Sequence, residues 1–398
     1  MANIIEYVRR TSDTFIARPF TRVDGLVLSW LSYLRFPEEL PETQTALGLM
    51  LAQIGNCSSL LGLVAPAHNP DSCEELLRAC AISPRFSLVR VCRTVEEGSV
   101  EKQEQFAATT FILPGIDEAF IGFRGTDDTL LGWKESFNLG FSKAVPAQTA
   151  ARDYVERVAR ETDCPLWIGG HSKGGNLATF ATMTANSATR ARIKACFAYD
   201  APGFSKAAMQ SGEFNSDWSL IKNTIPQESL VGMLLNSEAP EPCITRTTHP
   251  GIMQHSPFYW VIEGNDFATV DSITYDAYRR NKRLNAWINS MSAQQIERFT
   301  GVLYRITRAT GEVTLSGLIA GMGNGSLEFM LRSLDGLPAQ DRQFFTNQLE
   351  ELAATMLLGP APVEPKTTAE RADHASERVA DATAKFNDTL SRLDKYRY

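Results

Sequence analysis

One stretch, PLWIGGHSKGGNLATFATM at residues 165–183, constrains the fold of this chain more than any other. Its apolar beginning predicts a strand, its end predicts a helix, and the pentapeptide GHSKG joins the two. A G-x-S-x-G turn in this position is typical of a nucleophile elbow, whose glycines leave room for a turn that strains the serine backbone. We therefore expect Ser172 to stand above a sheet edge as a nucleophile. The N–H of Lys173, which starts the helix, would then face the oxygen of a reacting carbonyl.

Short β-rich runs alternate with helical patterns on both sides of this turn. Such alternation predicts βαβ units and a mostly parallel sheet flanked by helices, the α/β class. The first 90 residues and the segment after residue 271 are mainly helical in pattern, so we expect helical additions at both ends. The predicted strands are 86–92, 106–113, 118–123, 165–170, 192–200 and 219–226, and the predicted helices between them are 131–141, 147–162 and 176–185.

The C-terminal third predicts helices and then a tail. The sequence PAPVEP at 360–365 has the composition of a stiff linker, and a charged, Ala-rich segment follows it. That last segment is either a docking or self-association helix or a solvated one. We expect an α/β core with its N-terminal helices over residues 1–310, a helical flank over 311–358, and linker and tail over 359–398; the helices predicted in this part are 271–308, 313–334 and 338–357.

Charge and hydropathy exclude several classes of protein. The chain has 39 Lys and Arg against 46 Asp and Glu, a net charge of −7, which gives no basic field for a nucleic-acid backbone. No stretch reaches the roughly 18 apolar residues of a membrane span, and the N-terminus has no secretory pattern. We expect a cytoplasmic protein that does not bind nucleic acid and has no membrane span.

No motif calls for a metal or a cofactor. The seven cysteines include no pair spaced for zinc or redox chemistry, and we interpret them as reduced residues, most of them buried. The glycine-rich GMGNGS at 321–326 follows a helical pattern and has no lysine, so helix termination explains it better than a phosphate-binding loop.

An elbow needs a second donor for the oxyanion, and an earlier predicted strand ends suitably. The sequence AFIGFRGTDDTLLGW at 119–133 is a strand that opens into a polar loop at Thr126, which offers an N–H and a hydroxyl. The alternative is a plain turn capped by Asp127 or Asp128. We interpret Arg124 as an ion-pair partner that supports the structure.

A serine nucleophile also needs a general base, and the chain has five histidines. Three of them are poor candidates for the base because of their positions: His68 precedes the predicted sheet, His171 lies within the elbow and His374 lies in the tail. His249 precedes Pro250 in a predicted turn, whereas His255 precedes an aromatic cluster, and we favour His255.

Two acidic residues compete to orient that base. Glu228 follows the predicted strand at 219–226, and Asp200 ends the predicted strand at 192–200. We favour Glu228, because Asp200 opens the tight segment DAPGF and would serve only to shape the rim of the site.

These motifs in this order, FRGTDDTLLGWKESFNLGF, GGHSKGGNLA, YDAPGF, IPQESLVGMLL and QHSPFYW, resemble those of the Mbeg1-like family of bacterial α/β-hydrolase-like proteins, and more distantly the class 3 lipases. The segment DGLVLSWLSYLRF near residue 24 also resembles the start of that family. The resemblance implies an α/β-hydrolase fold with Ser172 as nucleophile, His255 as base, and Thr126 and Lys173 as oxyanion donors. The acid of class 3 lipases is usually Asp, and Glu228 departs from that pattern. Residues 127–141 correspond to the lipase lid and are otherwise a core helix.

The sequence therefore predicts a serine esterase or lipase-like enzyme that acts on a small-molecule or lipid-like ester. An acyltransferase or a peptidase would use the same residues. A further alternative is an inactive hydrolase fold whose C-terminal helices bind a partner.

Overall fold

The computed structural model of the protein describes residues 2–36, 49–56, 65–66, 70–99, 104–126, 139–140, 142–309, 334 and 336–358. The chain divides into two compact units, Met1–Thr274 and Tyr275–Tyr398. The helices that begin at Tyr275 thus belong to the second unit, whereas the sequence analysis extended the first unit to residue 310. The predicted helix at 313–334, the GMGNGS segment and the tail at 359–398 lie outside the described residues.

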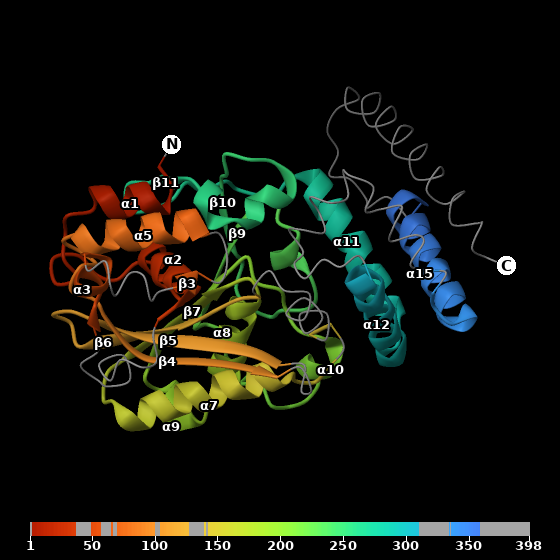
Figure 1. The fold of residues 1–398 in the computed structure, drawn as a ribbon, viewed down its shortest axis with the longest axis horizontal. Coiled ribbons are helices and arrows are strands. Elements are labelled where there is room, and N and C mark those ends of the chain that lie inside the picture. The colour runs from red at the N-terminus through yellow and green to blue at the C-terminus, as the bar shows by residue number, and fades with distance from the viewer. Residues whose placement is uncertain are drawn as a thin grey trace. The chain divides into compact units, whose positions relative to one another are not determined.

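An eight-stranded mixed sheet forms the centre of the first unit (Figure 1). Its strand order is β10-β9-β8-β7-β6-β5-β4-β2. The pairs from β6 to β10 are parallel, and those from β6 to β2 are antiparallel. The strands are β2 (Leu49–Met50), β4 (Arg90–Ser99), β5 (Glu104–Leu113), β6 (Glu118–Phe123), β7 (Leu166–His171), β8 (Ile193–Tyr199), β9 (Ile221–Pro226) and β10 (Cys243–Thr245).

Helices cover both faces of this sheet, which gives the α/β-hydrolase fold. Figure 1 shows α1 (Ile4–Arg10) and α5 (Pro70–Ile82) on one side and α7 (Pro146–Glu161) on the other. The alternation of β6 supplies both cores, because Phe120 packs with α1, α2 (Arg22–Leu31) and α5, whereas Ile121 packs with α7 and α8 (Lys173–Thr184). Shorter elements are α3 (Leu51–Asn56), α9 (Ser187–Arg190), α10 (Lys206–Met209), β1 (Leu34–Arg35), β3 (Ala65–Pro66), β11 (Ile262–Glu263), β12 (Asp266–Phe267), η2 (Val231–Met233), η3 (Gly251–His255) and η4 (Pro257–Tyr259).

Strand β4 begins later and runs further than the predicted 86–92. Residues 84–88 form a turn, and the strand extends to Ser99 through a bulge at Arg93, whose φ is 54°. A bulge inserts one residue without a partner and shifts the alternation of the side chains, which hides the strand from a period-two pattern.

A buried ion pair anchors the N-terminal helices. The guanidinium of Arg85 donates to both oxygens of Asp24 at 2.7 Å, and neither side chain is exposed to solvent. Arg85 also donates to the backbone carbonyls of Asp13, Thr14, Arg18 and Pro19. Every charged atom of the pair thus has a partner, as a buried pair requires.

The second unit contains three described helices, α11 (Tyr275–Ser290), α12 (Ala293–Ala309) and α15 (Ala339–Leu358). Their shared core includes Trp287, Phe299, Val302 and Phe345. In the part of the chain that the structure describes, no helix is both long and apolar enough to cross a membrane.

Candidate active site

Ser172 lies in a strained turn between β7 and α8. Its φ of 59° and ψ of −130° are unusual for a residue with a side chain, and its N–H donates to the carbonyl of Tyr199 at 2.9 Å. A Cβ on Gly170 would lie 2.3 Å from the carbonyl carbon of Gly174, so only glycine fits there. The local geometry is that of a nucleophile elbow.

The elbow lies directly against the end of β6. Phe123 of β6 pairs with Gly170 of β7, and a Cβ on Gly174 would lie only 2.2 Å from the carbonyl oxygen of Phe123. Thr126 follows three residues after the end of β6 and is half-buried. The backbone segments that carry Thr126 and Lys173 therefore leave the carboxyl ends of neighbouring strands. Asp127, Asp128 and most of the lid-like segment 127–141 lie outside the described residues.

The Lys173 side chain points into the protein. It is 2% exposed, and its ammonium donates to the carbonyl of Gln105 at 2.8 Å. This contact ties the elbow to the beginning of β5.

The imidazole of His255 faces Asp200. Its Nδ1 lies 2.6 Å from Oδ2 of Asp200, whose side chain is 1% exposed. Asp200 follows β8 immediately and has a φ of 43°. Because a carboxylate accepts hydrogen bonds, the Nδ1–H of a neutral His255 donates to Asp200. Its Nε2 is then the acceptor nitrogen of the ring.

The other oxygen of Asp200 receives two further hydrogen bonds. Oδ1 accepts from the Ser229 hydroxyl at 2.5 Å and from the Gly232 N–H at 3.0 Å. Three donors therefore surround the carboxylate, which stabilises its charge at a buried position. The sequence does not mark Ser229 as a functional residue, except by its place beside Glu228.

The structure does not bring Glu228 to the imidazole. Oε2 of Glu228 accepts from the N–H of Gly251 at 2.7 Å, and the N–H of Glu228 donates to Oε1 of Gln254 at 2.9 Å. Glu228 thus holds the backbone of the segment that ends at His255, whereas the carboxylate in contact with the imidazole is that of Asp200, the other acidic candidate.

The other described histidines occupy different environments. His249 is exposed, and its ring lies 3.9 Å from that of Tyr259. His171 is buried, and its Nε2 lies 2.7 Å from the carbonyl oxygen of His255. His68 and His374 lie outside the described residues.

Arg124 forms the expected structural ion pair beside this site. Its guanidinium lies 2.5 Å from the carboxylate of Glu96, which also pairs with Arg35 at 2.9 Å. Burial opposes the charging of Glu96, but the two guanidinium groups hold the pKa of its carboxyl below the usual range. In the described ranges, no group of three His, Cys, Asp or Glu side chains is placed to hold a metal ion.

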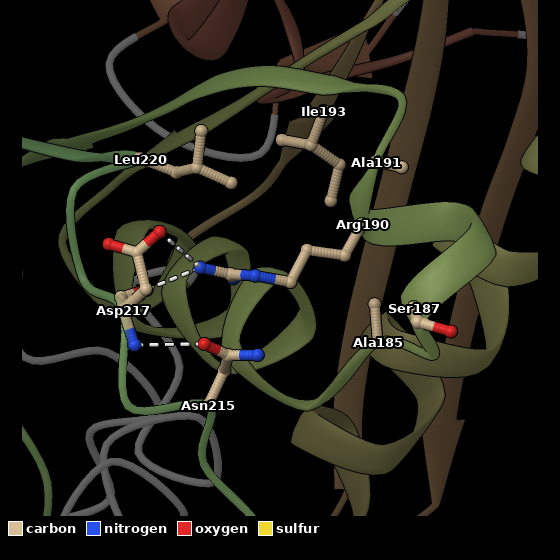
Figure 2. A pocket seen from close by; sticks show the side chains of 8 residues that line it. All are labelled: Ala185, Ser187, Arg190, Ala191, Ile193, Asn215, Asp217 and Leu220. Carbon is tan, nitrogen blue, oxygen red and sulfur yellow. Dashed lines mark hydrogen bonds and ion pairs between the residues drawn. The ribbon is translucent and has the colours of Figure 1, made fainter.

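A pocket of about 460 Å³ lies elsewhere in the first unit (Figure 2). Arg190 extends across it toward Asp217, and Asn215 accepts from the N–H of Asp217 at 2.8 Å. Ile193, which begins β8, lines it, so the pocket lies at the opposite end of β8 from Asp200. It contains none of the candidate catalytic residues.

Comparison with known proteins gives a family and a distant structural likeness. No curated protein matches the chain. The solved structure of Lip2 lipase from Yarrowia lipolytica is 10% identical, with 39% of this chain and 65% of the lipase covered and a TM-score of 0.27. The Mbeg1-like family matches residues 80–305, and the segment near residue 24 that resembles the family's start lies outside that match. Since the match covers more than half of its residues, the chain belongs to the Mbeg1-like family.

Proposed function

We propose that this protein is a serine hydrolase that cleaves a carboxylic ester through an acyl-enzyme on Ser172. The observation that carries the proposal is the 2.6 Å contact between Nδ1 of His255 and Asp200, one strand away from the strained turn at Ser172. The proposal is supported by a half-buried serine in a strained turn after β7 and by a base that contacts the buried carboxylate following β8.

In the proposed reaction, Nε2 of His255 removes the hydroxyl proton of Ser172 as Oγ bonds to the ester carbonyl carbon. The N–H of Lys173 and the N–H or hydroxyl of Thr126 donate to the oxyanion. The carbon–oxygen bond to the alcohol then breaks, and His255 gives its proton to the leaving oxygen. Water attacks the acyl group by the same steps and restores the serine.

Asp200 would hold the Nδ1–H tautomer and stabilise the imidazolium that forms at His255. The hydrogen bonds from Ser229 and Gly232 to Oδ1 fix the orientation of the carboxylate. Glu228 serves the site indirectly, because it holds the backbone of Gly251 in the segment that carries the base.

The proposed substrate is a small-molecule or lipid-like ester. Water as the acyl acceptor distinguishes the hydrolase from an acyltransferase, and an ester in place of an amide distinguishes it from a peptidase. We expect turnover of p-nitrophenyl esters by the wild-type protein, with the preferred acyl length read from a series of acetate to dodecanoate.

The matched control is Ser172→Ala, which removes one oxygen at the turn. We expect this variant to lose at least about 10³-fold in kcat while it keeps the melting temperature within a few degrees. Turnover that survives in Ser172→Ala would contradict the proposal.

A further inference from the structure

We propose that His171 is a positioning residue that fixes the catalytic base to the nucleophile turn. This inference rests on the proposed function, because it concerns how His255 is held beside Ser172. His171 is the residue immediately before the nucleophile, and its imidazole bonds to the backbone of the base 84 positions further along the chain. The turn at residues 171–172 thus carries the nucleophile Ser172 and also holds the backbone of the base His255.

The contact fixes the tautomer of His171. Its Nε2 lies 2.7 Å from the carbonyl oxygen of His255, and a carbonyl oxygen only accepts hydrogen bonds. Nε2 therefore carries the proton and donates it. In a neutral ring the other nitrogen, Nδ1, is then an acceptor, and the hydroxyl of Tyr33 lies 3.3 Å from it.

The surroundings of His171 hold its ring in this orientation. The side chain is 3% exposed, and its ring lies 5.1 Å from Trp30 in an edge contact. The alternation of β7 places His171 on the same face as Trp167, which is the face that α2 covers. A buried ring enclosed by aromatic side chains has little freedom to leave the carbonyl of His255.

The two imidazole rings also contact each other. Their centroids are 4.5 Å apart at an interplanar angle of 41°. In the proposed reaction His255 becomes positively charged, and a second cation at that distance would oppose this step. In this inference His171 stays neutral, so its Nε2–H supports the backbone of the base without placing a second positive charge beside the imidazole.

Three substitutions at one position separate the donor from the packing. Glutamine can place an amide N–H near the position of Nε2, asparagine places its amide near Nδ1, and leucine provides volume without a donor. The test compares the second-order rate constant of labelling by a fluorophosphonate, together with kcat and KM for the preferred ester, between each variant and the wild type. We expect His171→Leu and His171→Asn to label about 10- to 100-fold more slowly than wild type, His171→Gln to stay within about fivefold, and KM to change little.

Equal rates in all four proteins would overturn the inference, as would equal loss in all three variants, because packing alone would then explain the effect. A wild-type protein that is not labelled at all would instead contradict the proposed function. The hydrogen bond itself is tested without any activity, by the ¹⁵N shifts of the histidine rings in the wild-type protein. We expect the Nε2–H tautomer at His171, and an Nδ1–H tautomer would refute the contact even if every variant failed to fold.

Discussion

The imidazole Nδ1 of His255 lies 2.6 Å from Oδ2 of Asp200, although the two residues are 55 positions apart. The contact follows from the order of the strands. Asp200 follows β8, which pairs in parallel with β7, and the N–H of Ser172 donates to the last residue of β8. The serine and the aspartate are therefore held at the same edge by the sheet itself, and His255 contacts the aspartate from the segment after β10.

The first prediction concerns the acid. Asp200→Asn keeps the shape of the side chain but removes the charge that stabilises the imidazolium, so we expect kcat to fall by about 10³- to 10⁴-fold. Steady-state hydrolysis of the preferred p-nitrophenyl ester measures this loss.

Glu228→Gln is the matched control, because it neutralises the carboxylate that the sequence analysis favoured. A carboxylate oxygen of Glu228 accepts a hydrogen bond from the N–H of Gly251, and the amide oxygen of a glutamine can accept the same bond. We expect a loss within about tenfold. A larger loss in Glu228→Gln than in Asp200→Asn would reverse the assignment.

The second prediction concerns Ser229, whose hydroxyl donates to Oδ1 of Asp200. Ser229→Ala removes one donor from the buried carboxylate, and we expect kcat to fall by about 3- to 30-fold with KM nearly unchanged. The exposed Ser237→Ala is a suitable comparison and should match wild type. Identical kinetics in the two variants would show that Ser229 does not support the acid.

The third prediction concerns stability. Arg85→Met leaves the carboxylate of Asp24 buried without its cation, which costs about 3–5 kcal/mol in the free energy of unfolding. Arg78→Met breaks the exposed pair with Glu74 and should cost less than about 1 kcal/mol. Denaturant unfolding followed by circular dichroism compares the two. A similar small cost for both would mean that the buried pair is not needed for the fold.

The fourth prediction concerns alkaline pH. Burial raises the pKa of the thiols of Cys73, Cys92 and Cys196 to about 12, whereas the pKa of a thiol in an unfolded chain is about 8.5. Between these values the unfolded chain releases protons that the folded protein keeps, so stability falls as the pH rises. Each thiol contributes a slope of up to ~1.4 kcal/mol per pH unit.

Unfolding free energies at pH 8, 9 and 10 test this prediction under reducing conditions. In Cys196→Ala the unfolding free energy should fall less steeply with pH, because one of the three thiols no longer contributes. This holds whatever the substitution does to the unfolding free energy at pH 8. An unchanged slope would mean that Cys196 titrates alike in the folded and unfolded protein.

Much of the fold could be predicted because it depends on local patterns. The family resemblance and the α/β-hydrolase fold are confirmed, and the predicted strand at 165–170 matches β7 within one residue. The structure also shows the strained turn that the glycines around Ser172 predict. Short elements such as β2 and β10 have two and three residues, too few for any periodicity to show in the sequence.

The partner of His255 could not be predicted, because it depends on which strand ends are neighbours. Glu228 and Asp200 both follow predicted strands, and only the pairing of β8 with β7 places Asp200 beside the elbow. The positive φ of Asp200, which is uncommon for a residue with a side chain, has no distinct signal in DAPGF. The contact of His171 with His255 could not be predicted for the same reason, because the sequence shows His171 only as a residue of the G-x-S-x-G turn.

The most direct test of the account is covalent labelling by a fluorophosphonate, read by intact mass and peptide mapping. We predict one adduct per wild-type chain, on Ser172, with labelling abolished in Ser172→Ala and strongly slowed in His255→Ala and Asp200→Asn. A wild-type protein that stays unlabelled while a control serine hydrolase reacts, or an adduct on any other residue, would contradict the claim that Ser172 is the nucleophile.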